Sequence, residues 1–358
     1  MDQVVYGIPV LGVILQFFGY LIDHLPTSGP TIVAAATPLG FGALCGVVCE
    51  RSGVVNIGIE GTMLTAAFTG WVGAIAAVAV LGPQTPGPLG ISPALLIGLL
   101  AAILSAVAIS LLHAWLSISL RVDQIISGTI INILAFGITG YLNNVIASQS
   151  PTSGGTFQQL AIPDAVTNLP VVGWLIAAFL NQGPLTLTLL VSVVVLQLLL
   201  FRSRWGLRTR AVGEHPKAAE TVGIDVIRLR YRNVMIGGVF AGLGGAWLSM
   251  EVTGSFQAGG TAGRGFIALA AMIVGRWTPV GAFGAAIFFA LFGVLGDLMG
   301  PNGIAPPPGD LGVIVHALPS QLFSALPYVA TIIVLAGVIG RSSPPAADGR
   351  PYEREATN

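Results

Sequence analysis

Charged residues are scarce in this chain, and their scarcity excludes a soluble globular protein. Only 8% of the 358 residues are charged and 54% are hydrophobic, whereas about a quarter of a soluble domain is charged. The mean hydropathy is +0.85, and the apolar runs reach about 20 residues, the length that crosses roughly 30 Å of hydrocarbon. These runs are continuous, so the alternation typical of a transmembrane barrel is missing. The composition predicts an all-α, polytopic transmembrane helical bundle.

Lysine, cysteine and histidine are also scarce, and each scarcity argues against one kind of chemistry. The single lysine, Lys217, follows Pro216, so the Gly-Lys-Ser/Thr end of a P-loop does not occur. Cys45 and Cys49 lie four residues apart in an apolar run without a third ligand nearby, which favours buried small side chains over a metal pair. The four histidines form no HExxH motif. We therefore expect no enzymatic activity of the chain itself, no metal and no cofactor.

The chain contains a series of apolar runs separated by polar breaks. Ten of them are predicted to be membrane spans: residues 8–22, 31–48, 63–81, 94–120, 125–146, 185–201, 234–250, 266–275, 280–299 and 322–339. A further run, 171–180, is too short to span. We expect residues 1–341 to form a single transmembrane domain and the polar residues 342–358 to form a disordered tail.

The strongly polar segment 202–232 determines the predicted orientation. It holds eight of the fifteen basic residues, and short loops rich in Lys and Arg stay in the cytoplasm. Alternating the spans from there places both termini inside and residues 148–170 outside, with Arg264 as the one arginine outside. Within the segment, Pro216 suits the first turn of a helix and Gly223 suits its end. The pattern predicts a short cytoplasmic helix, suited to docking a soluble partner.

Polar residues inside the apolar part are costly in hydrocarbon, so they face a cavity or pair with one another. Asn56 and Glu60 share one helix face within the glycine-punctuated segment 50–61, and irregular backbone at membrane depth is tolerated where it is buried or lines a path. Alternatively, Glu60 pairs with an arginine or caps a helix. Gln124 either faces a path or belongs to a helix cap, and Asn132 either faces a path or joins two helices.

Four motifs in collinear order give the chain a resemblance to a known family. They are ERSGVVNIGIEG (50–61), RVDQIISGTIIN (121–132), RWGLRTRAVGEHPKAAETVGI (204–224) and GRGFIALAAMIVGRWTPVGA (263–282). Together they resemble the membrane permease subunits of ABC importers of the branched-chain amino acid/simple sugar class and, within it, those of bacterial nucleoside importers. The resemblance covers residues 31–300.

The resemblance implies roles for particular residues. It implies that a cytoplasmic coupling helix docks into an ATPase subunit through Gly213, Glu214, His215, Pro216, Lys217, Ala218, Ala219, Glu220 and Gly223. His215 stands where the family pattern has Asn, which weakens that contact. It also implies that the segment beginning at Asn56 lines the translocation path. A hydroxyl-rich substrate needs amide and carboxylate partners, which Asn56, Glu60, Gln124 and Asn132 offer.

The resulting expectation is a permease subunit of an ATP-driven nucleoside importer in the bacterial inner membrane. Its expected partners are two ABC ATPase subunits, a second and different permease subunit, an external substrate-binding lipoprotein, membrane lipid and a small polar substrate, but no nucleic acid. Simple sugars or branched-chain amino acids remain alternative substrates. A stand-alone secondary transporter is a second alternative, although it has no need of the basic segment with its short helix.

Overall fold

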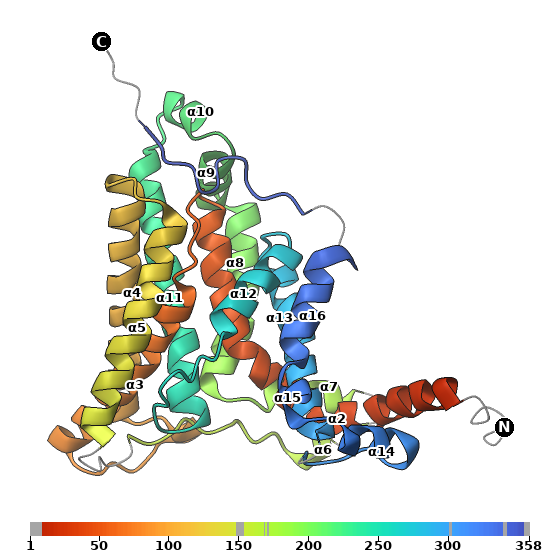
Figure 1. Ribbon diagram of the computed structural model, residues 1–358. Helices are drawn as coiled ribbons and strands as arrows, with labels where there is room; N and C mark the ends of the chain where they lie inside the picture. The colour runs from red at the N-terminus through yellow and green to blue at the C-terminus, as the bar shows by residue number, and fades with distance from the viewer. Residues whose placement is uncertain are drawn as a thin grey trace. The chain divides into compact units, whose positions relative to one another are not determined.

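The computed structural model describes residues 9–147, 154–167, 169, 172–300, 303–338 and 342–353. Within these residues the chain forms helices and turns, with no strand (Figure 1). Seven helical stretches of this described part are long and apolar enough to cross a membrane: Gly12–Glu50, Ile59–Leu81, Pro93–Ser119, Gln124–Ile146, Pro184–Arg202, Val226–Val252 and Pro279–Met299. The structure confirms the predicted all-α polytopic fold, although ten spans were expected.

The first two predicted spans form one helix, α2 (Pro9–Glu50), of 42 residues. At a rise of 1.5 Å per residue it is about 63 Å long, well beyond one membrane crossing. The polar residues at the predicted break do not end the helix, because they bond to it. Ser28 Oγ and Thr27 Oγ1 both donate to the carbonyl of His24, at 2.7 and 3.0 Å, a back-bond that Ser and Thr make within helices.

The chain divides into two compact units, and each has its own core. The first unit comprises Met1–Ala36, Leu160–Gln182 and Ile287–Val338, and the second comprises Thr37–Gln159, Gly183–Ala286 and Ile339–Asn358. Two helices, α2 and α13 (Pro279–Met299), run from one unit into the other.

The first unit contains the ends of α2 and α13 and a set of short helices. These are α6 (Asp164–Thr167), α7 (Gly173–Leu180), α14 (Gly309–Ala317), α15 (Ser320–Ser324), α16 (Leu326–Ile333) and the π-helical turn η4 (Val334–Val338). The predicted span 322–339 is therefore broken into pieces, because Pro327 opens a new helix at α16 and cannot continue the one before. Phe323 of α15 packs in the core of this unit with Tyr20 and Leu295.

The second unit is a bundle of the longer helices. They are α3 (Ile59–Leu81), α4 (Pro93–Ala114), α5 (Gln124–Ala147), α8 (Pro184–Arg202) and α11 (Val226–Ala246), with the shorter α12 (Arg264–Val274). Helix α3 lies at the centre and packs against α4, α5, α11 and α12. Gly245 makes one such contact possible, since a Cβ there would lie 2.2 Å from the carbonyl oxygen of Met63. Small residues let transmembrane helices approach in this way.

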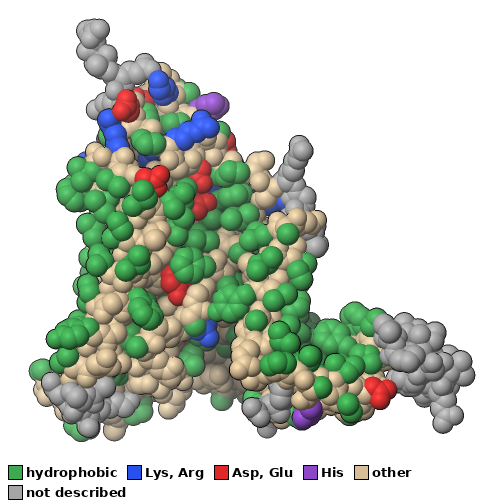
Figure 2. Space-filling model, in the orientation of Figure 1, with side chains coloured by type: hydrophobic (Ala, Val, Ile, Leu, Met, Phe, Trp, Pro, Cys, Tyr) green, Lys and Arg blue, Asp and Glu red, His purple; other side chains and the backbone are tan. Residues whose placement is uncertain are grey.

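The basic segment 202–232 forms three helices at one end of the second unit. Helices α9 (Arg204–Glu214) and α10 (Pro216–Thr221) lie where charged side chains gather (Figures 1 and 2). The predicted short helix is confirmed, and Gly223 ends it with φ +82°. Helix α11 begins at Val226, ahead of the predicted 234, because Asp225 caps it by accepting the Arg228 N–H at 3.0 Å. Its first turns therefore carry arginines.

Residues 342–353, here called the C-terminal strap, differ from the expected disordered tail. Tyr352 is buried in a cluster with Val212, Ala219 and Val226. Disorder follows from too little apolar burial, and the polar composition of this segment concealed that its few apolar side chains have a core to join. Residues 354–358 lie outside the described part of the chain.

Candidate functional site

The polar residues predicted to line a path meet at the break between α2 and α3. Helix α2 ends at Glu50 and α3 begins at Ile59, so the chain between them lacks helical hydrogen bonds. Asn132 of α5 supplies part of them: its Oδ1 accepts the Gly61 N–H at 2.7 Å, and its Nδ2 donates to the Ile57 carbonyl at 3.0 Å. Both ends of the Asn132 amide therefore bind backbone, which is the helix-joining alternative considered from the sequence.

Gln124 and His113 hold the middle of the same break. Gln124 Oε1 accepts the Val55 N–H at 2.7 Å. His113 Nε2 lies 2.9 Å from the Val55 carbonyl, and its Nδ1 lies 3.1 Å from the Ser127 hydroxyl. Because a carbonyl only accepts, Nε2 carries the hydrogen. The sequence did not indicate His113, since its partner is a backbone carbonyl 58 positions away.

Asn56 is buried beneath the break. Only 1% of its surface is exposed, and its Nδ2 lies 3.8 and 3.9 Å from the sulfurs of Cys45 and Cys49. Its Oδ1 has no hydrogen-bond partner among the described residues. Both cysteines are free and buried, as expected. The four predicted path residues thus share one neighbourhood, but three of them serve its backbone and core.

Glu60 caps the short helix α12. Its Oε1 accepts the Gly263 N–H at 2.8 Å and its Oε2 accepts the Gly265 N–H at 2.6 Å. A carboxylate is favoured at a helix N-terminus, where backbone N–H groups are unpaired and the helix dipole is positive. Gly265 permits the approach, because a Cβ there would lie 2.6 Å from the Glu60 Cα. The geometry is that of the capping alternative raised from the sequence.

The other end of α12 is held by the same break. Arg51 donates from Nε to the Trp277 carbonyl at 2.9 Å and from Nη2 to the Arg276 carbonyl at 3.1 Å. With 11 residues, α12 is about 16 Å long, roughly half the hydrocarbon thickness.

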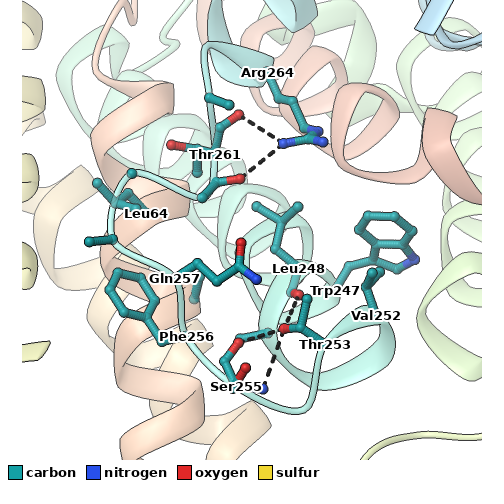
Figure 3. A pocket seen from close by; sticks show the side chains of 16 residues that line it. Leu64, Trp247, Leu248, Val252, Thr253, Ser255, Phe256, Gln257, Thr261 and Arg264 are labelled. Carbon is teal, nitrogen blue, oxygen red and sulfur yellow. Dashed lines mark hydrogen bonds between the residues drawn. The ribbon is translucent and has the colours of Figure 1, made fainter. Parts of the chain in front are cut away.

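A cavity of about 430 Å³ lies beside the N-terminus of α12 within the second unit (Figure 3). Its walls come from the π-helical turn η3 (Trp247–Val252), the loop 253–263, Arg264, and Leu64 and Ala67 of α3. The loop lies toward the side of this unit away from α9 and α10 (Figure 1). The volume falls in the range of about 300–1,000 Å³ typical of small-molecule sites.

One wall of this cavity is aromatic. Phe256 contacts Trp71 at 6.3 Å between ring centroids with planes 28° apart, and meets Phe68 edge-on at 5.2 Å. Such stacked and edge-on pairs are favoured by the ring quadrupoles. The packing fixes Phe256 at the edge of the cavity, where it offers an aromatic surface to a ligand.

The opposite side is polar. Gln257 points toward the middle of the cavity, and Arg264 lies beside it (Figure 3). The Arg264 Nη1 donates to the Gly260 carbonyl at 2.9 Å, which holds the guanidinium against the loop. The buried hydroxyl of Ser249 has no partner among the described residues. The pocket therefore offers an aromatic face, an amide and a guanidinium, and the Ser249 hydroxyl is buried in its wall.

None of the four predicted path residues lines this cavity, and Glu60 is linked to it only through the backbone that it caps. The sequence did not single out Phe256, Gln257 or Ser249, because they belong to no motif. A usable signal was nevertheless present: the polar, glycine-rich stretch 253–263 interrupts apolar runs directly before a helix too short to span.

The predicted coupling segment divides into exposed residues and residues that support them. The exposed ones are Glu214, His215, Lys217, Ala218 and Gly223, while Gly213 and Ala219 are buried and Pro216 and Glu220 are intermediate. Two large apolar side chains are also exposed at this end, Leu207 at 62% and Val222 at 75%. Apolar groups with a charged rim are typical of an interaction surface. Gly213 has no room for a side chain, since a Cβ would lie 2.3 Å from the Arg51 carbonyl oxygen.

Comparison with known proteins places this architecture in a family. The family described as "Branched-chain amino acid transport system / permease component" matches residues 30–335. The chain belongs to this family and is a multi-pass membrane subunit of a transport system, which confirms the resemblance found in its motifs.

Individual relatives cover nearly the whole chain. The guanosine ABC transporter permease protein NupQ of Bacillus subtilis is 38% identical over 93% of this chain and 98% of its own length. The nucleoside ABC transporter permease protein NupC of Lactococcus lactis is 37% identical over 88% of this chain and 93% of its own. The putative glucose ABC transporter permease protein TsgC13 of Haloferax volcanii is 34% identical over 90% and 96%. No solved structure matches the chain.

Proposed function

We propose that this chain forms the translocation path of an ATP-driven nucleoside importer and that it couples to separate ATPase subunits through α10. The observation that carries the proposal is the cavity beside the N-terminus of α12, with its aromatic wall and uncharged polar groups. The relatives named for guanosine and nucleosides, at 38% and 37% identity, support the substrate class.

The chemistry of the cavity suits a neutral base attached to a sugar. An aromatic wall at Phe256 favours stacking with a planar base, an interaction worth about 1–3 kcal/mol for bases on aromatic side chains. Gln257 can both donate and accept, as a base edge requires, and Ser249 can bond to a hydroxyl. The Arg264 guanidinium already donates to a loop carbonyl.

The second half of the proposal concerns coupling. Helix α10 carries exposed Lys217 and Ala218 and is followed by exposed Val222, a small surface suited to a groove on an ATPase. The chain has no Gly-Lys-Ser/Thr sequence, so hydrolysis falls to its partners. We propose two ATPase subunits, a second permease subunit and an external substrate-binding lipoprotein. The basic end of the second unit and the C-terminal strap that packs on it then face the cytoplasm of a bacterial inner membrane.

A sugar importer is the second candidate, because the relative TsgC13 is named for glucose. A sugar would use Gln257 and Ser249 in the same way. It would gain less from Phe256, since it has no planar base to stack.

Uptake in proteoliposomes tests the proposal. The chain would be reconstituted with its partner permease, its ATPase subunits and its binding lipoprotein, and ATP-dependent entry of labelled guanosine would be measured. We expect an excess of unlabelled uridine or inosine to compete and an excess of glucose or leucine to have no effect. Competition by glucose alone would favour the sugar importer. Uptake without ATP or ATPase subunits would favour a secondary transporter.

A further inference from the structure

We propose that the C-terminal strap is a clamp that holds α10 in its docking position and ties it to the break between α2 and α3. The inference rests on the proposed function of α10 as the coupling helix. It assigns to residues 342–353 the task of transmitting movement between that helix and the membrane part of the second unit.

Helix α10 requires outside support. It has six residues, far fewer than the roughly 12–15 that an isolated helix needs. Only Ala219 of α10 is buried, and it packs in the cluster formed by Val212 of α9, Val226 of α11 and Tyr352 of the strap. The Tyr352 hydroxyl also donates to the Glu220 carboxylate. The Tyr352 ring of the strap thus packs against the buried side of α10 and supports the helix.

The strap also supplies hydrogen-bond donors to the end of α9. The last four carbonyls of a helix have no partner within it, and Gly213 lies in the last turn of α9. Its carbonyl accepts the Ala347 N–H at 2.9 Å. The Ala346 N–H donates to the Glu214 carboxylate at 3.2 Å. Two successive backbone N–H groups of the strap therefore hold the end of α9, next to the start of α10.

A buried arginine joins the strap to the membrane helices. Arg230 of α11 is 1% exposed. It donates from Nη1 to the Arg350 carbonyl at 3.1 Å and from Nε to the Ser52 carbonyl at 3.0 Å. Ser52 belongs to the break that precedes α3, and Glu60 lies in the first turn of α3. A continuous set of contacts therefore runs from α10 through the strap and Arg230 to the segment that holds α12.

The far end of the strap is attached more weakly. Arg121, in the turn before α5, forms an ion pair with Glu353 at 2.6 Å, but the two side chains are 48% and 71% exposed. Exposed pairs contribute little to stability. The clamp therefore depends on Tyr352, on Arg230 and on the two donated N–H groups rather than on this ion pair.

The decisive measurement compares Tyr352→Ala with Tyr352→Phe in the full reconstituted transporter. Tyr352→Ala removes the aromatic ring that packs against α10, whereas Tyr352→Phe keeps the ring and loses only the hydroxyl. We expect Tyr352→Ala still to assemble with the ATPase subunits but to lower nucleoside uptake per ATP hydrolysed by about tenfold. It should also raise amide exchange in α10 while leaving α12 unchanged. Tyr352→Phe should keep both the uptake per ATP hydrolysed and the amide exchange of α10 close to the wild-type values.

Pro344→Ala, at an exposed position of the strap, is the control and should match the wild type.

A second variant covers the case in which Tyr352→Ala does not fold. Ala347→Pro removes one donated N–H and leaves the Tyr352 ring in place. It should therefore also lower nucleoside uptake per ATP hydrolysed, but by less than Tyr352→Ala. A wild-type ratio of uptake to hydrolysis in both variants, with unchanged exchange in α10, would overturn the clamp. If the wild-type chain itself neither binds ATPase subunits nor imports nucleosides, the proposed function fails instead.

Discussion

Two carboxylates of the second unit each cap the N-terminus of a helix that is far away in the sequence. Glu60 accepts two N–H groups at the start of α12, and Glu251 accepts the Leu185 N–H of α8 at 2.7 Å. A glutamate inside an apolar region is readily interpreted as a ligand for substrate. Here both side chains accept hydrogen bonds from the partly buried starts of helices, which is one way in which an acidic residue within an apolar region is accommodated.

The first prediction concerns Glu60. Glu60→Leu leaves two buried N–H groups without acceptors, at about 1–3 kcal/mol each, so it should lower both thermal stability and transport strongly. Glu60→Gln keeps one acceptor and loses the favourable charge, so both properties should fall to an intermediate level. Thermal unfolding in detergent and uptake would be measured together. Glu353→Leu, at an exposed glutamate, should leave both nearly unchanged. A stable Glu60→Leu protein without transport would show direct substrate contact instead of capping.

The second prediction concerns the pocket. Gln257→Leu removes a donor and an acceptor from the cavity, so the KM for nucleoside should rise by about tenfold, corresponding to one unpaired substrate group at roughly 1.4 kcal/mol. Stability should change little, because the side chain points into the cavity. Gln158→Leu, at an exposed glutamine outside this cavity, is the matched control. Equal kinetics for the two variants would remove Gln257 from the site.

At the scale of the elements, the coupling region shows which features a sequence reveals. Pro216 and Gly223 mark the ends of a short helix by backbone chemistry alone, and the structure confirms that helix. The strap was not predicted, because the few apolar residues between 342 and 353 show no periodicity. The strap is ordered because Tyr352 packs on Val212, Ala219 and Val226. These three residues come together only when the chain has folded.

The third prediction tests the junction between α9 and the break. A Cβ at Gly213 would lie 2.3 Å from the Arg51 carbonyl oxygen, so Gly213→Ala must displace α9 and should strongly reduce ATP-dependent uptake. Gly284 has open space around it and no left-handed φ, so Gly284→Ala should preserve uptake and serves as the control. Uptake in membrane vesicles with matched protein levels is the measurement. Full activity of Gly213→Ala would show that this junction tolerates movement.

The fourth prediction concerns the response of the strap to pH. Burial raises the pKa of Asp348 from 3.8 to about 7, although a hydrogen bond with Glu50 and the charge of Arg230 oppose the shift. The docked strap therefore binds a proton that the free strap releases above about pH 4. Docking should be strongest near pH 4, weaken as the pH rises toward 7, and stay constant above that.

A spin label at Ala346→Cys would report this change, since both native cysteines are buried. Its mobility should increase between about pH 4 and pH 7. In an Asp348→Asn background, which imitates the protonated form, the mobility should stay low throughout. A mobility independent of pH in both proteins would contradict the prediction.

At the scale of the whole molecule, the membrane class, the helical fold and most helix positions could be predicted because they follow from apolar length. Two features could not. Residues 23–28 interrupt hydrophobicity without ending α2, since their side chains bond back to the helix. That Asn56, Gln124 and Asn132 line a path stays a prediction, because an intramembrane amide serves backbone or ligand equally well. Only the position of its distant partner decides between the two.

The fifth prediction concerns orientation, which follows from the distribution of arginine. Single cysteines at Ala218 and Gln158, both exposed positions, should react with an impermeant maleimide from opposite sides of the membrane, Ala218 from the cytoplasm. Labelling is measured in intact cells and in inverted vesicles. Reaction of both positions from the same side would contradict the proposed topology.

Attachment at both ends leaves α12 with few independent degrees of freedom. Arg51 holds the turn that directly follows α12, and Glu60 holds its N-terminus. These two residues belong to one short stretch of chain. Because α12 is attached to this stretch of chain at both ends, the helix cannot tilt unless this support moves with it. The polar wall of the cavity can therefore change only if that support is displaced as a whole, or if the loop bends at Gly254, Gly259 and Gly263, whose φ values are all positive. Under the proposed function, ligand recognition and energy coupling therefore depend on one moving part, and selection on either function constrains the other.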